Sequence, residues 1–291
     1  MFYVERSVRY MFPERLFNYV GYYYLHLRNG VWPKMLNLKK PFSFNEKIIW
    51  LKLNHKVPNA TELCDKYRVR SFVKDKIGEK HLVPLIDCFD NVDQVHIDKL
   101  PDSFVLKPNH GSGYVIVVPS KKKLKTRDII AIKKRLREWM ETDYYKWGKS
   151  YEYKGIRRRI LCEIYLESST EKPLLDYKVH CFGGEPQLIQ VDFDRFSRHT
   201  RKFYDLNWNV TPFSTLYPLS NKDVSKPDRL DQMLIYARKL SEGLIYSRID
   251  FYIYNGQIYF GEITLHHGGG FEPFVPQEFD LILGRMIKLP I

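Results

Sequence analysis

Cysteine is scarce in this chain, and its spacing excludes two kinds of small, cross-linked fold. Only four of the 291 residues are cysteines, and no two of them form a C-x-x-C pair. A disulfide framework and a zinc site both need closely and regularly spaced cysteines, so we expect neither. Stability must come from a hydrophobic core, for which 44% apolar residues are sufficient.

Long apolar runs are also absent from the sequence. No stretch approaches the ~18 consecutive apolar residues of a membrane-spanning helix. The first ten residues, MFYVERSVRY, are charged from Glu5 onward and lack the apolar segment of a secretory signal. We therefore expect a cytoplasmic location.

Acidic residues are outnumbered by basic ones. The chain has 34 Asp and Glu against 47 Lys and Arg, which gives a formal net charge of +13. A charge of this sign predicts an anionic partner: nucleic acid, phosphates, an acidic glycan or an anionic membrane surface. The basic runs KKKLK (121–125) and RRR (157–159) are not accompanied by a DNA-recognition helix or by aromatic residues on which bases could stack. We therefore expect no nucleic-acid partner.

Helix and strand patterns follow one another in an order typical of a mixed α+β protein. Capping signals predict a helix over 42–54, and Gly78 predicts the end of a helix that begins at Asp65. The remaining patterns predict a hairpin over 104–118, a helix over 126–145, a strand over 159–166, two strands about Gly183-Gly184, a helix over 228–244 and a hairpin over 247–265. This order predicts three parts: an N-terminal helical region (1–100), a small hairpin-plus-helix lid (101–160) inserted in a larger mixed sheet, and a large subdomain (161–291).

The stretch SFVLKPNHGSGYVIVV (103–118) joins two strand-like runs through a lysine and a tip of small residues. One interpretation is an ordinary hairpin with a Gly-rich turn. The other is a flap whose backbone N–H groups hold a phosphate, with Lys107 as the counter-charge. It is not a Walker A loop, because G-x-x-x-x-G-K-[ST] is absent.

The last hairpin carries two carboxylates on otherwise apolar strands. Asp250 and Glu262 are costly there unless they have a partner, and two carboxylates together suit Mg²⁺ bound to nucleotide phosphates. The alternative is a structural ion pair with Arg248. A two-residue turn at Asn255-Gly256 would place the carboxylates on opposite faces, so a shared metal predicts a three-residue loop or a bulge.

Several of these stretches occur in the order used by ATP-grasp enzymes. They are DKYRVRSFVKDKIG, FVLKPNHGSG, RILCEIYLE, DYKVHCF, SRIDFYI and YFGEITLHHGGGFEPF. Together with FSFNEKIIWLKLN and the terminal LGRMIKLP, they make the chain resemble the TupA-like branch of that superfamily, named for teichuronopeptide synthesis. The resemblance covers about 40–291.

The resemblance implies an ATP-grasp fold and a role for each matching position. The phosphates would contact Lys107 and a flap of Asn109, His110, Gly111, Ser112 and Gly113. Adenine would bind a hinge of Glu163, Ile164, Tyr165 and Leu166, and the ribose would contact Asp176. The catalytic residues would be Lys107, Lys178 and Arg248, of which Arg248 would stabilise the transferred phosphoryl group. The ligands of Mg²⁺ would be Asp250, Glu262 and Thr264, although the usual motif ends in Asn, a better cation ligand than Thr. A further basic contact would come from Lys66 or Arg70, between which the sequence does not decide.

Two groups of residues are candidates for binding the second substrate. One is the basic run Arg195, Arg198, Arg201 and Lys202, which could instead be a solvated face. The other is the Gly-rich loop with His267, Gly268 and Gly269. The aromatic and basic N-terminal helices have two interpretations: a structural cap over the core, or a surface on the inner face of the plasma membrane.

The resemblance implies an ATP- and Mg²⁺-dependent ligase that joins a carboxylate to an amine in surface (capsular) polysaccharide biosynthesis. Its partners would be an acidic or lipid-linked glycan and an amine or amino acid. The alternatives are a kinase that phosphorylates a sugar, a glycosyltransferase-like protein that uses a nucleotide sugar, and a non-catalytic glycan- or membrane-binding module. The oligomeric state cannot be inferred from the sequence.

Overall fold

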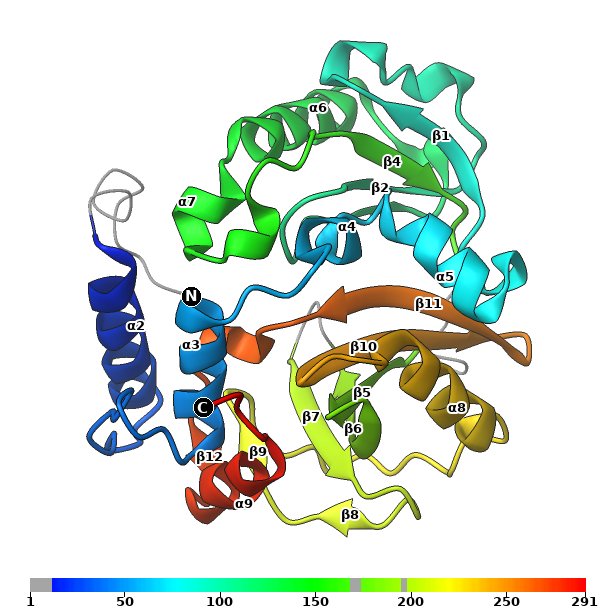
Figure 1. Ribbon diagram of the computed structural model, residues 1–291. Helices are drawn as coiled ribbons and strands as arrows, with labels where there is room; N and C mark the ends of the chain where they lie inside the picture. Colours follow the sequence, from blue (N-terminus) through cyan, green and yellow to red (C-terminus); the bar gives the residue numbers. More distant parts are fainter. Residues whose placement is uncertain (1–11, 168–173, 195–197) are drawn as a thin grey trace.

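The computed structural model describes residues 12–167, 174–194 and 198–291 (Figure 1). Its helices are α2 (Glu14–Arg28), α3 (Phe44–Asn54), α4 (Ala60–Cys64), α5 (Val69–Ile77), α6 (Thr126–Glu141), α7 (Tyr144–Gly148), α8 (Leu230–Ser241) and α9 (Glu278–Met286). Its strands are β1 (Leu85–Phe89), β2 (Phe104–Pro108), β3 (Ile116–Val118), β4 (Ile160–Glu163), β5 (Asp176–Phe182), β6 (Glu185–Phe193), β7 (Thr200–Tyr204), β8 (Val210–Thr211), β9 (Ser214–Thr215), β10 (Tyr246–Tyr254), β11 (Gln257–Thr264) and β12 (Phe274–Val275). The predicted mixed α+β class is confirmed.

Two antiparallel sheets organise the molecule. The smaller has the strand order β1-β4-β2-β3, and the larger has the order β11-β10-β5-β6-β7-β8. In Figure 1 the small sheet and α6 lie above the large sheet, and α4 and α5 lie between them. The small sheet is wider than the predicted lid, because β1 lies within 1–100 and β4 continues past residue 160.

Local signals in the sequence set the ends of the helices. Ser43 and Glu46 form a reciprocal capping box at the start of α3, as the sequence predicts. Gly78, with φ 100°, ends α5. The predicted helix over 126–145 is interrupted, because Asp143 accepts a hydrogen bond from the Lys146 backbone N–H and begins α7.

Each sheet buries one apolar face. In the small sheet, Phe104 and Leu106 pack with Leu136 of α6. In the large sheet, Val179 and Phe251 pack with Met233 of α8 in the main core. Because side chains alternate between the faces of a strand, the polar residues between these positions point to the opposite face of the large sheet.

The β10–β11 hairpin combines a tight turn with a bulge. Tyr254 pairs with Gln257, so the turn has two residues, and the three-residue loop is not formed. The register shifts between Asp250 and Phe251, after which Asp250 lies opposite Glu262. The prediction that a shared face requires a loop or a bulge is therefore confirmed in its second form.

The N-terminal part of the chain covers one end of the large sheet. Phe17 of α2 packs in a cluster with Ile49 of α3 and Phe271. Within the described residues, the structure contains no helix with the length and hydropathy needed to span a bilayer.

Candidate active site

The polar face of the large sheet gathers charged and other polar residues from five adjacent strands. The strand registers place these side chains in neighbouring rows of one face. They are Glu262 and Thr264 of β11, Arg248 and Asp250 of β10, Asp176, Lys178 and His180 of β5, Gln190 and Asp192 of β6, and Arg201 of β7. Most are buried, so their charges must be satisfied by one another.

Asp250 lies at the centre of this network and is only 2% exposed. Arg248 donates to both of its carboxylate oxygens at 2.7 Å, and Lys178 donates to Oδ2 at 2.9 Å. Burial opposes ionisation, but Arg248 and Lys178 lower the pKa of Asp250 below its ordinary value. Arg248 also donates to Glu262 Oε1 at 3.0 Å, so one guanidinium bridges the two carboxylates among the three predicted metal ligands.

Lys178 connects three carboxylates. Besides Asp250, its Nζ contacts Asp176 and lies 3.8 Å from Asp192. Asp176 is 3% exposed and is held inside the sheet by this contact. Its assignment to the ribose stays a prediction, as does the catalytic assignment of Lys178.

Lys66 and Arg70, the two candidates for the further basic contact, make different contacts in the structure. The Nζ of Lys66 lies 3.6 Å from Glu262 Oε2 and donates to the Gly111 carbonyl at 2.6 Å. It therefore joins the tip of the small sheet to the carboxylate pair. Arg70 instead lies 3.6 Å from Glu163 Oε1. Arg70 also lines a pocket together with Tyr67 and Pro84, and Lys66 is not among the residues that line it.

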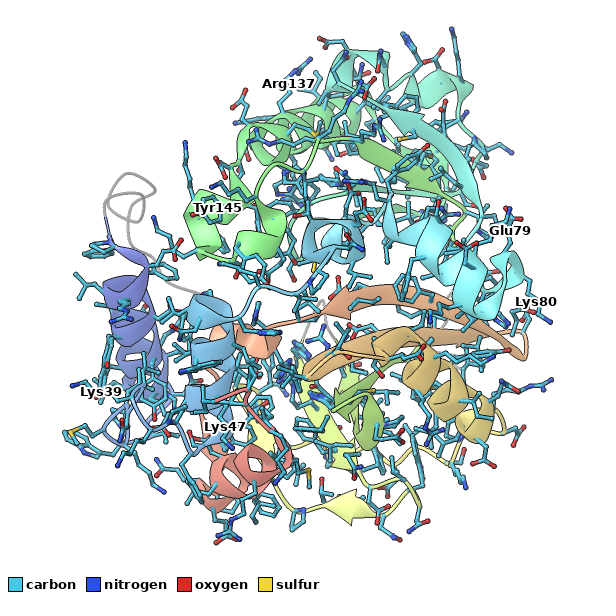
Figure 2. All side chains as sticks on the ribbon, in the orientation of Figure 1. Lys39, Lys47, Glu79, Lys80, Arg137 and Tyr145 are labelled. Carbon is cyan, nitrogen blue, oxygen red and sulfur yellow. The ribbon has the colours of Figure 1, made fainter. Side chains whose placement is uncertain are left out.

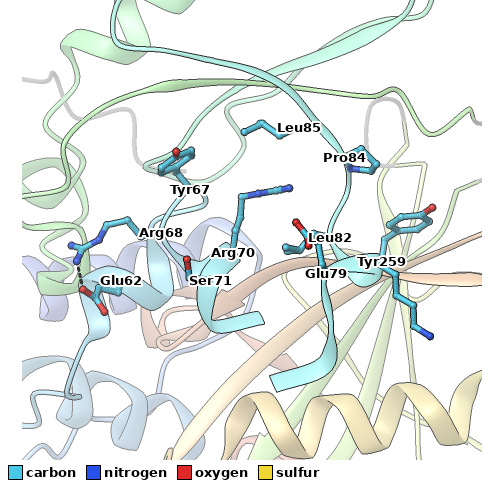
Figure 3. A pocket seen from close by; sticks show the side chains of 11 residues that line it. Glu62, Tyr67, Arg68, Arg70, Ser71, Glu79, Leu82, Pro84, Leu85 and Tyr259 are labelled. Carbon is cyan, nitrogen blue, oxygen red and sulfur yellow. Dashed lines mark hydrogen bonds and ion pairs between the residues drawn. The ribbon is translucent and has the colours of Figure 1, made fainter. Parts of the chain in front are cut away.

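The predicted hinge and phosphate lysine are in contact. Lys107 Nζ lies 2.7 Å from Glu163 Oε2. The chain then continues through Ile164, whose N–H donates to the Pro84 carbonyl, and on to Tyr165 and Leu166. A pocket of about 820 Å³ adjoins this corner, and Figure 3 shows Arg70 in it between Tyr67 and Pro84.

The predicted flap, 109–113, is partly anchored. Asn109 is fully buried and donates to Asp65 at 2.8 Å, and His110, 2% exposed, contacts the Trp139 carbonyl. Gly111 has φ +83°, and a Cβ there would lie 2.8 Å from the Tyr144 ring. Only Ser112 and Gly113 are exposed, so Asn109, His110 and Gly111 form a buried base, and the binding of phosphate by this flap stays a prediction.

The predicted basic run does not form one surface. Arg195 lies outside the described residues, and Arg198 is exposed. Arg201 and Lys202 alternate on β7, so they point to opposite faces. Arg201 is 3.1 Å from Asp192 and 2.7 Å from Glu272, whereas Lys202 pairs with Asp223 at 2.9 Å. Their joint role in substrate binding is not supported by this geometry.

His267 lies behind the carboxylate pair. It is 3% exposed; its Nδ1 accepts from Arg248 Nη1 at 2.9 Å, and its Nε2 lies 3.3 Å from Glu272 Oε2. Burial lowers its pKa, against the opposing effect of Glu272. Gly268 and Gly269 follow with φ of 57° and 66°. The sequence predicts that His267 contacts the substrate, whereas in the structure His267 contacts Arg248.

Some members of the network were missed in the sequence. They are His180, Gln190, Asp192 and Glu272. Polar residues at alternate positions of DYKVH and QVD were a usable signal for the first three. Glu272 gave no such signal, because it lies in a loop and meets Arg201 only through the fold.

The carboxylate pair fits a magnesium ion by its chemistry and access. Mg²⁺ prefers oxygen ligands and commonly binds one or two carboxylates together with phosphate oxygens and water. Asp250 and Glu262 face one another, the Glu262 side chain is 28% exposed, and the Thr264 hydroxyl is 3.4 Å from Glu262. The described residues contain no group of three or more His, Cys, Asp or Glu arranged to hold a metal by themselves.

Comparison with known proteins identifies the family. The model of the TupA-like ATPgrasp family matches residues 46–288, and the chain belongs to this family. No curated protein is significantly similar in sequence.

Solved structures of ligases show distant similarity. The ATP-grasp ligase PsnB with a minimal precursor is 13% identical, with a TM-score of 0.40 over 76% of this chain and 59% of that one. The D-alanine–D-alanine ligases of Bacillus anthracis and Helicobacter pylori are 16% and 15% identical, with TM-scores of 0.42 and 0.41 over 78% of this chain. This chain spans 67% and 63% of their lengths.

Proposed function

We propose that this chain is an ATP- and Mg²⁺-dependent ligase that activates a carboxylate as an acyl phosphate and joins it to an amine. One observation carries the proposal: in an ATP-grasp family member, Asp250 and Glu262 face each other on β10 and β11 and share Arg248. A bulge is needed to bring them together, which a purely apolar hairpin would not require.

The residues of the site would act by position and charge. Asp250 and Glu262 would hold Mg²⁺, which would supply charge neutralisation for the nucleotide phosphates. Lys107, now paired with Glu163, and Lys66, now beside Gly111, would be additional cations for the phosphates. Arg248 would face the oxygens of the group in transfer, and phosphoryl transfer needs little more than such placement.

The flap would protect the activated carboxylate. An acyl phosphate is hydrolysed when water reaches it, so a cover of Ser112 and Gly113 would favour attack by the amine. Asn109 and His110 anchor that cover to the body of the protein. This arrangement would allow the tip to move while its base stays fixed.

The substrate would be a precursor of a surface (capsular) polysaccharide. The net charge of +13 favours an acidic or lipid-linked glycan, with an amine or amino acid as co-substrate. The inner face of the plasma membrane is where a lipid-linked acceptor would be met.

The proposal is tested by thermal shift with a non-hydrolysable ATP analogue, with and without Mg²⁺. A ligand at ~100 times its Kd adds about 2.7 kcal/mol to the free energy of unfolding. We expect a magnesium-dependent shift that is lost in Lys107→Ala. A shift with UDP-sugars alone would contradict the proposal and favour a glycosyltransferase.

The carboxylate pair is tested by the double variant Asp250→Asn, Glu262→Gln. Because both metal ligands lose their charge, we expect ATP consumption to fall at least about a hundredfold. The matched control is Glu185→Gln. It neutralises an exposed carboxylate of the same sheet, which is paired with Arg238 of α8. Normal ATP consumption by the double variant would show that the site lies elsewhere. If the wild-type reaction yields a phosphorylated sugar and no amide, the protein is a kinase.

A further inference from the structure

Helix α2 has apolar residues on two opposite sides. Phe17 and Tyr22 are buried, at 6% and 3% exposure, and pack towards α3. On the other side Leu16, Val20 and Leu27 are 47%, 36% and 53% exposed. At 3.6 residues per turn these three lie within about 40° of one another. A helix that only caps a core would be polar there.

The segment after α2 adds two further exposed apolar residues. Trp32 and Met35 are 82% and 85% exposed, the two highest values among the exposed large apolar residues. The Leu36 N–H donates to the Tyr23 hydroxyl at 3.2 Å, which holds the segment against the helix. Tyr23 follows Leu16 by seven residues and so lies on the same side of α2 as the stripe.

Basic residues border the stripe. Residues 12–42 contain five lysines or arginines and a single carboxylate, Glu14, which accepts from the Tyr145 hydroxyl. Arg15, Lys34, Lys39 and Lys40 are exposed, and the described part of the chain places no carboxylate within salt-bridge distance of them. Figure 2 shows Lys39 beside the lower end of α2.

These features match an anionic lipid surface better than another protein. A second copy would bring two basic rims together and be repelled. A bilayer with anionic head groups offers both counter-charges and an apolar layer, and exposed tryptophan is favoured at such an interface. The stripe is narrow, as expected for a helix that lies in the plane of the interface.

We propose that the outer side of α2 and the segment 32–40 form a docking surface for an anionic bilayer. The opposite side of α2 lies against the residue that follows the Gly-rich loop, the predicted contact of the second substrate, because the ring centroids of Phe17 and Phe271 are 6.1 Å apart. Docking would hold this loop close to the bilayer and suit an acceptor anchored in lipid. The choice of acceptor rests on the proposed function, whereas the docking surface does not.

The experiment is sedimentation of the full chain with vesicles of phosphatidylcholine, alone or with phosphatidylglycerol. We expect binding only to the anionic vesicles, weakened by salt. The variant Leu16→Asp, Leu27→Asp should lower the partition coefficient at least about tenfold, because it places charge in the stripe. The matched control is Ile130→Asp, since Ile130 is 63% exposed on the basic helix α6 and should bind like wild type.

Three outcomes overturn the proposal. The wild-type protein does not bind anionic vesicles, or the double variant binds them as well as wild type does. In the third, the wild-type protein is a dimer that does not bind vesicles, and the double variant is a monomer. If that variant does not fold, the double variant Lys39→Glu, Lys40→Glu replaces it. Loss of vesicle binding by this second variant supports the docking surface, and binding equal to that of wild type refutes it. The ATP-analogue shift is measured in parallel. Vesicle binding without that shift would refute the ligase but leave the docking surface standing.

Discussion

Arg248 connects three side chains of the candidate site. It is bonded to Asp250, Glu262 and His267. Burial opposes its charge, but Asp250 above all raises its pKa well above the ordinary value, so it stays a cation at any physiological pH. A buried cation with three fixed partners has little freedom to rotate, which suits a group that must meet a developing negative charge.

His267 is predicted to position Arg248. Replacing it by Phe removes the acceptor for Nη1 while keeping a buried ring, and a lost hydrogen bond to a charged group costs about 1.5–3 kcal/mol. If Arg248 acts on the transferred group, His267→Phe should lower kcat about tenfold or more and change KM for ATP little. His267→Asn supplies an acceptor near the Nδ1 position and should recover part of kcat. Equal losses in both variants would indicate a general packing effect.

At the scale of elements, the β10–β11 hairpin decides which carboxylates meet. The two-residue turn alone would pair Asp250 with Gly261. The bulge adds one residue on β11, so Glu262 takes that place on the polar face while Ile258 and Phe260 stay in the core. The extra residue is Gly261, which lies too close to the neighbouring strand to carry a side chain without strain.

A side chain at Gly261 should disturb the site. A Cβ there would lie 3.1 Å from the Asp250 carbonyl oxygen and 3.2 Å from the Tyr252 ring. Gly261→Val should therefore lower the free energy of unfolding by about 1–3 kcal/mol and weaken the magnesium-dependent ATP-analogue shift. The control is Gly148→Ala, whose Cβ would meet only Tyr144 at 3.9 Å. Denaturant unfolding measures both, and an unchanged Gly261→Val protein would show that the bulge tolerates bulk.

At the scale of the whole molecule, the site lies between two separately packed sheets. The small sheet has its own core with α6, and the large sheet has its own with α8. Polar contacts between buried side chains help to join the two parts among the described residues: His266 contacts Glu152 at 3.0 Å, and Asn109 contacts Asp65 at 2.8 Å. Polar links of this kind can rearrange more readily than a continuous apolar core.

The stability of the molecule should depend on pH through His110. Burial lowers its pKa from 6.5 to about 4. Below pH ~6.5 the unfolded chain takes up a proton that the folded protein refuses, so stability falls as pH falls. On going from about pH 7 to about pH 5, His110 should lower the free energy of unfolding by about 2 kcal/mol. Denaturant unfolding of wild type and His110→Gln should show a smaller loss in the variant, and parallel curves would contradict the assignment.

Much of the fold was predictable because its signals are local. Ser43 and Glu46 mark the start of α3, and Asn255-Gly256 marks a two-residue turn by its backbone preferences alone. The ordered motifs identified the family, which the family model confirms. The roles of the predicted site residues stay predictions, but the structure brings Asp250, Glu262, Arg248 and Lys178 together on one sheet face.

The sequence by itself determined the class of fold, the two carboxylates of the last hairpin and the lysine at the end of β2, but it left open whether the carboxylates share a face. Only the tertiary structure decided how polar groups are paired: Lys178 and Asp250 are 72 residues apart, and the Asn45 backbone N–H and the Asp280 carboxylate that accepts from it are 235 apart. It also decided that His267 turns inward to Arg248 and that Leu16 and Leu27 are left uncovered. Capping and alternation act over a few residues, whereas pairing and burial depend on which strands and helices become neighbours.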